Sequence, residues 1–191
     1  MFLEQFPGEG RQNGWIEVIC GSMFSGKTEE LIRRLKRVEF AQQKLLLFKP
    51  AIDNRYHDEH VVSHKGSSFV AQPVENAQVI LDQWKDERIV AIDEAQFFDD
   101  NLVGVCNELA KRGVRVILAG LDMDYLGKPF GPMPELLCAA EYVTKVHAIC
   151  VSCGNLAQYS HRTIKTDGQV LVGAVETYQP LCRACYNKVA H

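Results

Sequence analysis

Short apolar runs alternate with amphipathic segments along most of the chain. The strand-sized runs lie at 15–20, 44–48, 88–92, 114–119 and 142–146. The segments with apolar residues at helical spacing lie at 27–40, 78–84, 101–112 and 135–140. Runs that are apolar at successive positions are typical of strands buried on both faces. The alternation predicts an α/β fold, in which a parallel sheet carries helices on both faces.

Polar and glycine-rich stretches interrupt this alternation. Residues 51–66 are polar and aperiodic and 120–133 are rich in glycine and proline, so both are expected to be loops. After about 148 the pattern changes, and 155–181 is expected to form short strands around a turn at 165–168. We therefore expect a flexible N-terminus over 1–14, an α/β domain over 15–148 and a small lobe over 149–191.

Composition excludes several classes of protein. The chain has 191 residues, 47% of them hydrophobic and 24% charged, as in ordinary globular proteins. It has no apolar run of roughly 18 residues and no N-terminal leader pattern, so a cytoplasmic protein without a membrane segment is expected. Its 21 basic and 24 acidic residues give a net charge of −3, which argues against a nucleic-acid partner.

A phosphate-binding loop follows the first expected strand. The sequence Gly21-Ser22-Met23-Phe24-Ser25-Gly26-Lys27-Thr28 fits G-x-x-x-x-G-K-[ST]. Glycines let backbone N–H groups converge on phosphate oxygens at the start of a helix. In such loops the lysine reaches the β- and γ-phosphates and the hydroxyl binds Mg²⁺. We interpret the segment as an ATP site with Mg²⁺ at Thr28. A glycine-rich strand-to-helix turn without a ligand is the alternative.

Two carboxylates end the apolar strand at 88–92. Asp93 fits the acidic residue that holds Mg²⁺ in phosphate-loop proteins, and Glu94 is then available to deprotonate a nucleophile. The following Ala95 and Gln96 are included in the expected ATP site. A solvated acidic strand end is the alternative interpretation.

Seven cysteines include two Cys-x-x-Cys pairs, Cys150/Cys153 and Cys182/Cys185. Four thiolates suit a closed tetrahedral zinc site that is structural rather than catalytic. A redox dithiol and a disulfide pairing remain alternatives. We expect the other cysteines, at positions 20, 106 and 138, to be small buried hydrophobes. Positions 33, 34 and 36 are basic and are expected on the solvated face of the 27–40 helix.

Several segments together resemble the thymidine kinases of the compact, zinc-containing type found in bacteria, animals and large DNA viruses. The matching segments run in family order over roughly 15–187. They are 21–28, Asp53-Asn54-Arg55-Tyr56, Asp93-Glu94-Ala95-Gln96-Phe97-Phe98, Gly120-Leu121-Asp122, Lys128-Pro129-Phe130-Gly131, the first cysteine pair, and Glu176-x-Tyr178-x-x-x-Cys182-x-x-Cys185. The last of these is the most specific.

The resemblance implies a RecA-like phosphate-loop domain, with the zinc lobe forming a lasso over the base. It implies transfer of the ATP γ-phosphate to the 5′-hydroxyl of thymidine, giving dTMP in nucleoside salvage, with Glu94 as the base and with feedback inhibition by dTTP. A homotetramer is also implied. The substrate-binding positions it implies are Met23, Asp53, Arg55, Phe97, Leu121, Tyr125, Phe130, Val170, Leu171, Val172, Gly173 and Tyr178.

The chain departs from the family pattern at two positions. Ala95 stands where relatives often have glycine, and Tyr125 stands where they often have phenylalanine, which adds a hydroxyl at the expected base pocket. A second function class also fits part of the pattern. The Asp93–Gln96 segment resembles a helicase acidic box, so a zinc-ribbon ATPase acting on nucleic acid is the alternative. Its weakness is that 191 residues are too few for two motor domains.

Overall fold

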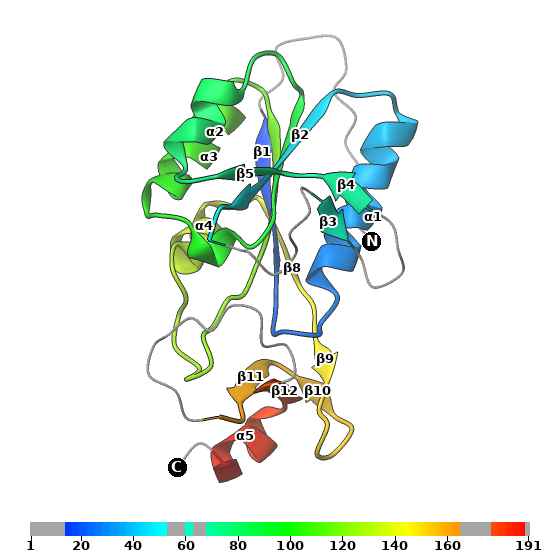
Figure 1. The fold of residues 1–191 in the computed structure, drawn as a ribbon, viewed down its shortest axis with the longest axis vertical. Coiled ribbons are helices and arrows are strands. Elements are labelled where there is room, and N and C mark those ends of the chain that lie inside the picture. The colour runs from blue at the N-terminus through cyan, green and yellow to red at the C-terminus, as the bar shows by residue number, and fades with distance from the viewer. Residues whose placement is uncertain (1–13, 53–59, 63–67, 165–176, 190–191) are drawn as a thin grey trace.

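The central element of the protein is a parallel β-sheet. The computed structural model describes residues 14–52, 60–62, 68–164 and 177–189. In that part of the chain six strands pair in the order β5-β2-β6-β7-β1-β8, and every neighbouring pair is parallel (Figure 1). The strands are β1 (Trp15–Cys20), β2 (Leu45–Pro50), β5 (Gln72–Val74), β6 (Ile89–Ile92), β7 (Arg115–Gly120) and β8 (Tyr142–Lys145).

Helices cover both faces of this sheet, as the sequence predicted. One face packs against α1 (Lys27–Phe40), whose Leu31 and Leu35 share a buried cluster with Ile117 of β7. The other face packs against α2 (Gln78–Gln83), α3 (Asn101–Lys111) and α4 (Met133–Ala139). The apolar positions of each helix are spaced to lie on one stripe, and that stripe is the buried one. Two cores on opposite faces therefore fix the sheet between them.

A small C-terminal lobe lies at one end of the sheet (Figure 1). It contains two antiparallel pairs: β9 (Ala148–Ile149) with β10 (Leu156–Ala157), and β11 (Tyr159–Arg162) with β12 (Tyr178–Leu181). The last element is α5 (Arg183–Val189). The lobe has its own buried cluster, which includes Ala157, Leu181 and Tyr186 and receives Met123 from the α/β domain. In the described part of the chain, no helix has the length and apolar character needed to cross a membrane.

The structure corrects several expected element boundaries. The expected loop at 51–66 contains β3 (His60–Val62), which pairs with β4 (Ser68–Val70), and β5 was not expected at all. Helix α4 begins at Met133, inside the expected loop, and α5 follows Cys182 unpredicted. Short strands depend on a distant partner rather than on local periodicity, so the sequence pattern does not reveal them. The expected turn at 165–168 lies outside the described residues.

The expectation of a solvated Arg34 was wrong, whereas Arg33 and Lys36 are exposed. The Arg34 side chain is 4% exposed and donates to Glu17 Oε2 at 2.6 Å and to Glu30 Oε1 at 2.9 Å. Glu17 lies on β1, is fully buried and also accepts from Arg115 Nε at 2.6 Å. The apolar stripe of α1 predicts which side faces the sheet, but a charged residue at its margin is buried because β1 and β7 supply its partners.

We predict that Arg34→Ala destabilises the fold, whereas Arg33→Ala does not. Removing Arg34 leaves the buried Glu17 carboxylate with fewer partners, so we expect a loss of about 2–4 kcal/mol in the free energy of unfolding. Arg33 pairs with Glu30 at the surface, where its removal costs about 0–1 kcal/mol. Urea unfolding at one protein concentration measures both variants. Equal stability of the two variants would contradict the prediction.

Candidate functional site

The ends of β1, β6 and β7 meet at one edge of the sheet. These strands are adjacent and parallel, so their carboxyl ends lie on the same side. The phosphate loop follows β1, Asp93 and Glu94 follow β6, and Leu121 follows β7. Ligands of open parallel sheets bind at this edge. The topology thus brings together two segments that the sequence singled out separately.

The phosphate loop has the backbone geometry that its glycines predict. Gly26 has a φ of 84°, in the left-handed region, and directly precedes α1. A Cβ at Gly21 would lie 2.2 Å from the Val146 carbonyl oxygen, so a side chain is excluded there. Lys27 Nζ donates to the Ser22 carbonyl at 2.8 Å, as does Ser25 Oγ at 2.7 Å. The lysine is therefore held inside the curve of the loop, at the N-terminus of a helix that favours anions.

The acidic pair lies on a strained turn. Asp93 is buried, and its Oδ1 accepts from the Glu94 backbone N–H at 2.9 Å. Glu94 has φ 52° and ψ 41°, a left-handed conformation that costs a non-glycine residue about 1–2 kcal/mol. The 3₁₀ turn η1 (Ala95–Phe97) begins immediately afterwards. The strain indicates that the orientation of the Glu94 side chain is imposed by its surroundings.

Aromatic residues gather beside this edge. The Phe97 and Phe130 rings meet edge to face with centroids 5.5 Å apart. Tyr125 lies in the loop after β7, and the Arg162 guanidinium is 3.5 Å from the centre of its ring. Arg162 on β11 is in register with Tyr178 on β12. The structure thus brings Phe97 and Phe130 together, and it brings Tyr125 against the C-terminal lobe.

The loop after β7 is held in shape by Asp124. Its Oδ1 accepts from the backbone N–H groups of Leu126 and Lys128, both at 2.9 Å. Its own backbone N–H donates to the Lys128 carbonyl at 2.8 Å, which closes a tight hairpin. An aspartate carboxylate that accepts hydrogen bonds from nearby backbone N–H groups can hold a turn in shape without regular secondary structure. Tyr125 is therefore presented by an ordered loop.

Direct hydrogen bonds join the C-terminal lobe to the α/β domain. Ser160 Oγ accepts from the Met23 backbone N–H at 2.9 Å, inside the phosphate loop. Tyr186 Oη donates to the Tyr125 carbonyl at 2.9 Å. Ser160, Arg162 and Tyr186 were not identified from the sequence, since nothing in their local pattern marks a contact with the phosphate loop or with Tyr125.

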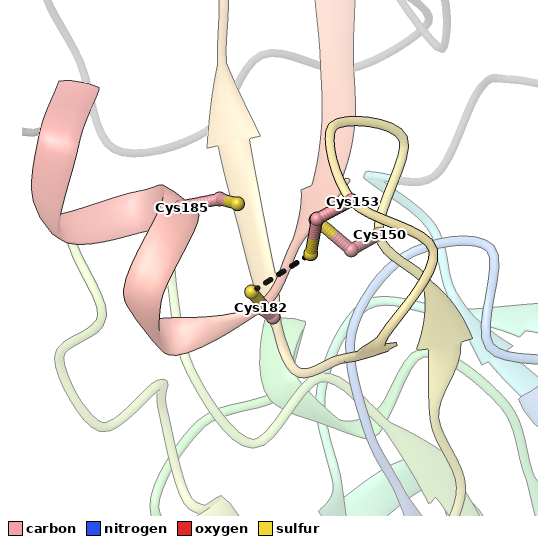
Figure 2. A group of neighbouring side chains, drawn as sticks. All are labelled: Cys150, Cys153, Cys182 and Cys185. Carbon is pink, nitrogen blue, oxygen red and sulfur yellow. Dashed lines mark hydrogen bonds between the residues drawn. The ribbon is translucent and has the colours of Figure 1, made fainter.

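The two cysteine pairs come together in the C-terminal lobe (Figure 2). Cys150 and Cys153 lie on the turn between β9 and β10, whereas Cys182 and Cys185 lie at the start of α5. All four Sγ atoms are within 4.8 Å of one another, and those of Cys153 and Cys182 are 3.5 Å apart. Zinc bound tetrahedrally to sulfur at its usual distance requires sulfur atoms about 3.8 Å apart. The cluster therefore fits a structural zinc ion.

The local electrostatics differ among the four thiols. The pKa is lowered at Cys150 and Cys182, whereas at Cys185 a hydrogen bond with Ser152 is outweighed by the thiols of Cys153 and Cys182, and the pKa is raised to about 11. Hydrogen bonds from backbone N–H groups, that of Cys182 foremost, lower the pKa of the Cys150 thiol to about 6. Deprotonated sulfur is the form that binds metal. Elsewhere, burial raises the pKa of the Cys20 thiol to about 11 and raises that of Cys106 as well. These two are inert buried residues, as expected, but the expectation was wrong for Cys138, which is exposed.

Some predicted site residues fall outside the described part of the chain. They are Asp53, Arg55, Val170, Leu171, Val172 and Gly173. The remaining predicted residues lie on the sheet edge, in the phosphate loop, in the loop after β7 or in the C-terminal lobe.

Comparison with known proteins gives a consistent result over nearly the whole chain. The family model described as thymidine kinase matches residues 14–186. A thymidine kinase of Bacteroides thetaiotaomicron is 59% identical over 186 residues, which cover 97% of this chain and 94% of that protein. A thymidine kinase of Porphyromonas gingivalis is 53% identical over 97% of this chain and 91% of that protein. One from a Rhodothermus species is 53% identical over 93% of this chain and 83% of that protein.

We predict that the cysteine cluster binds about one zinc ion per chain. Cys153→Ser removes one of four thiolates and should sharply lower the zinc content, because the remaining site is open and weaker. Cys138→Ser is the matched control, since Cys138 is an exposed thiol outside the cluster. Elemental analysis of the purified variants measures the metal. A Cys153→Ser protein with the zinc content of the control would exclude the cluster as the binding site.

Proposed function

The chain belongs to the thymidine kinase family and is an ATP:thymidine 5′-phosphotransferase, and we propose how its residues share this reaction. One observation carries the proposal. The phosphate loop after β1 and the Asp93–Glu94 pair after β6 lie at the same edge of the sheet. A nucleotide bound at the loop would have its terminal phosphate beside a carboxylate that can receive a proton.

The phosphate loop would bind the triphosphate of ATP. Lys27 would leave its hydrogen bond to Ser22 and meet the β- and γ-phosphates, while the backbone N–H groups of 21–28 surround their oxygens. The Thr28 hydroxyl and the Asp93 carboxylate are oxygen ligands of the kind that Mg²⁺ prefers. Mg²⁺ bound there with ATP would neutralise phosphate charge. The remaining positive charge comes from Lys27 and the N-terminus of α1.

Glu94 would act as the general base. The 5′-hydroxyl oxygen of thymidine attacks the γ-phosphorus, the bond from that phosphorus to the β-γ bridging oxygen breaks, and its electron pair leaves with ADP. The hydroxyl proton passes to the Glu94 carboxylate. The strained turn at Glu94 supports this role, because such conformations cluster at active sites.

The base of thymidine would bind at the junction of sheet and C-terminal lobe. The proposed contacts among described residues are Met23, Phe97, Leu121, Tyr125, Phe130 and Tyr178. We also propose Asp53, Arg55 and the segment 170–173 as substrate contacts, on the family resemblance. The lobe over 149–191 would act as a zinc-stabilised lasso attached to a nucleotide-binding domain over 15–148. Two contacts between the lobe and the domain support this proposal: Arg162 lies against the Tyr125 ring, and Ser160 accepts a hydrogen bond from the phosphate loop.

We further propose feedback inhibition by dTTP, because one ligand carrying both thymine and a triphosphate matches this junction. A cytoplasmic homotetramer is proposed on the family resemblance. The alternative, an ATPase acting on nucleic acid, rests on the Asp93–Gln96 segment, which a nucleoside kinase uses equally well.

An ADP-release assay tests the function. We expect turnover with ATP and thymidine, none above background with ATP and single-stranded DNA, and inhibition of the thymidine reaction by dTTP. Identification of dTMP as product completes the test. Stimulation by DNA without stimulation by thymidine would favour the alternative instead.

We predict that Glu94→Gln lowers kcat by about 10²–10⁴-fold, the usual contribution of a general base. The substitution keeps the shape of the side chain but removes the proton acceptor, so the affinity for ATP should change little. Glu39→Gln, on the exposed surface of α1, is the control and should leave kcat unchanged. Steady-state kinetics with thymidine measure both variants. Near wild-type turnover of Glu94→Gln would remove Glu94 from the mechanism.

A further inference from the structure

We propose that Gln96 is a positioning residue that holds the Glu94 carboxylate in its reactive orientation. The inference rests on the proposed role of Glu94 as the base. Gln96 Nε2 donates to Glu94 Oε2 at 2.5 Å, and Gln96 Oε1 accepts from the Leu121 backbone N–H at 2.9 Å. The amide therefore links the end of β6 to the end of β7 across the candidate site.

The orientation of this amide is determined by its partner on β7. A backbone N–H is only a donor, so the group that faces Leu121 has to be the amide oxygen. The NH₂ group then has to face Glu94, whose oxygen accepts. Gln96 would thereby hold the Glu94 side chain in one orientation.

The Gln96 side chain has little room to move. Gln96 is 2% exposed. A Cβ on Gly120, at the end of β7, would lie 2.9 Å from Gln96 Oε1, and one on Gly131 would lie 2.2 Å from the Gln96 backbone oxygen. Glycines on both sides therefore allow the close packing that encloses Gln96. A buried amide with both polar ends engaged transmits the position of β7 to Glu94.

The arrangement accounts for the strained conformation of Glu94. The left-handed backbone turns Glu94 out of the line of β6. The Asp93 carboxylate then accepts from its backbone N–H, and the Gln96 amide donates to its side chain. The carboxylate held in this way would take the 5′-hydroxyl proton. The sequence predicted that Gln96 belongs to the ATP site. The hydrogen bonds of its side chain instead favour a role in orienting Glu94.

Two substitutions test the proposal. Gln96→Leu removes both hydrogen bonds at similar volume, and we expect kcat to fall about 10–100-fold, part of the contribution of a general base, with KM for ATP and thymidine within about threefold. Gln96→Glu keeps an acceptor for Leu121 but places a second carboxylate against Glu94. The pair then shares a proton, so the acidic limb of the kcat–pH profile should move to higher pH and activity should recover as pH rises. Gln83→Leu, on the exposed last residue of α2, is the control.

A double variant, in which Gln96→Leu is combined with Glu94→Gln, distinguishes a failure of this proposal from a failure of the proposed function. Once the base is absent, adding Gln96→Leu should cost little more, because positioning residues act through the group they hold. Full additivity of the two losses would overturn the positioning role. So would an unchanged kcat and pH profile in both Gln96 variants, or a raised KM for ATP at wild-type kcat. If Gln96→Leu does not fold, the pH profile of Gln96→Glu decides. Wild-type turnover of Glu94→Gln would instead overturn the base itself.

Discussion

The parallel pairing of β7 between β6 and β1 is the constraint on which the rest of the structure depends. Val116 of β7 is in register with Ile16 on one side and Val90 on the other. Since the strands run in the same direction, the loops that follow them leave at one edge. The phosphate loop and the acidic pair are neighbours for that reason alone. Helices on both faces then bury the strands between two apolar cores.

Buried polar groups make this arrangement specific as well as compact. Glu17, Arg34 and Arg115 join β1, α1 and β7 on one face of the sheet through charge-assisted hydrogen bonds. At the carboxyl edge, the Gln96 side-chain amide joins β6 to β7 by donating to the Glu94 carboxylate and accepting from the Leu121 backbone N–H. Each group is satisfied only when its strands and helix are correctly aligned, because an unpaired buried charge or amide is costly.

The C-terminal lobe contacts the candidate site from outside the sheet. Its buried cluster is small, and a zinc ion bound by the four cysteines would supply an additional constraint. Ser160 reaches the phosphate loop, while Arg162 and Tyr186 contact Tyr125. A metal bound at this cluster would therefore stabilise the lobe that contacts the phosphate loop and the loop after β7.

The sequence by itself determined the features that depend on neighbours along the chain. The phosphate loop, the acidic end of β6, the cysteine pairs and the amphipathic helices are encoded by spacing over a few residues, and spacing is visible in one dimension. Only the tertiary structure decided the burial of Arg34, the exposure of Cys138, the contact of Ser160 with Met23 and the use of Gln96 to link two strands. The burial of Arg34 and the contacts of Ser160 and Gln96 each depend on a partner far away in the chain, whereas the exposure of Cys138 depends on which side of α4 packs against the sheet. Register and packing set the energies of these arrangements, and no local pattern records them.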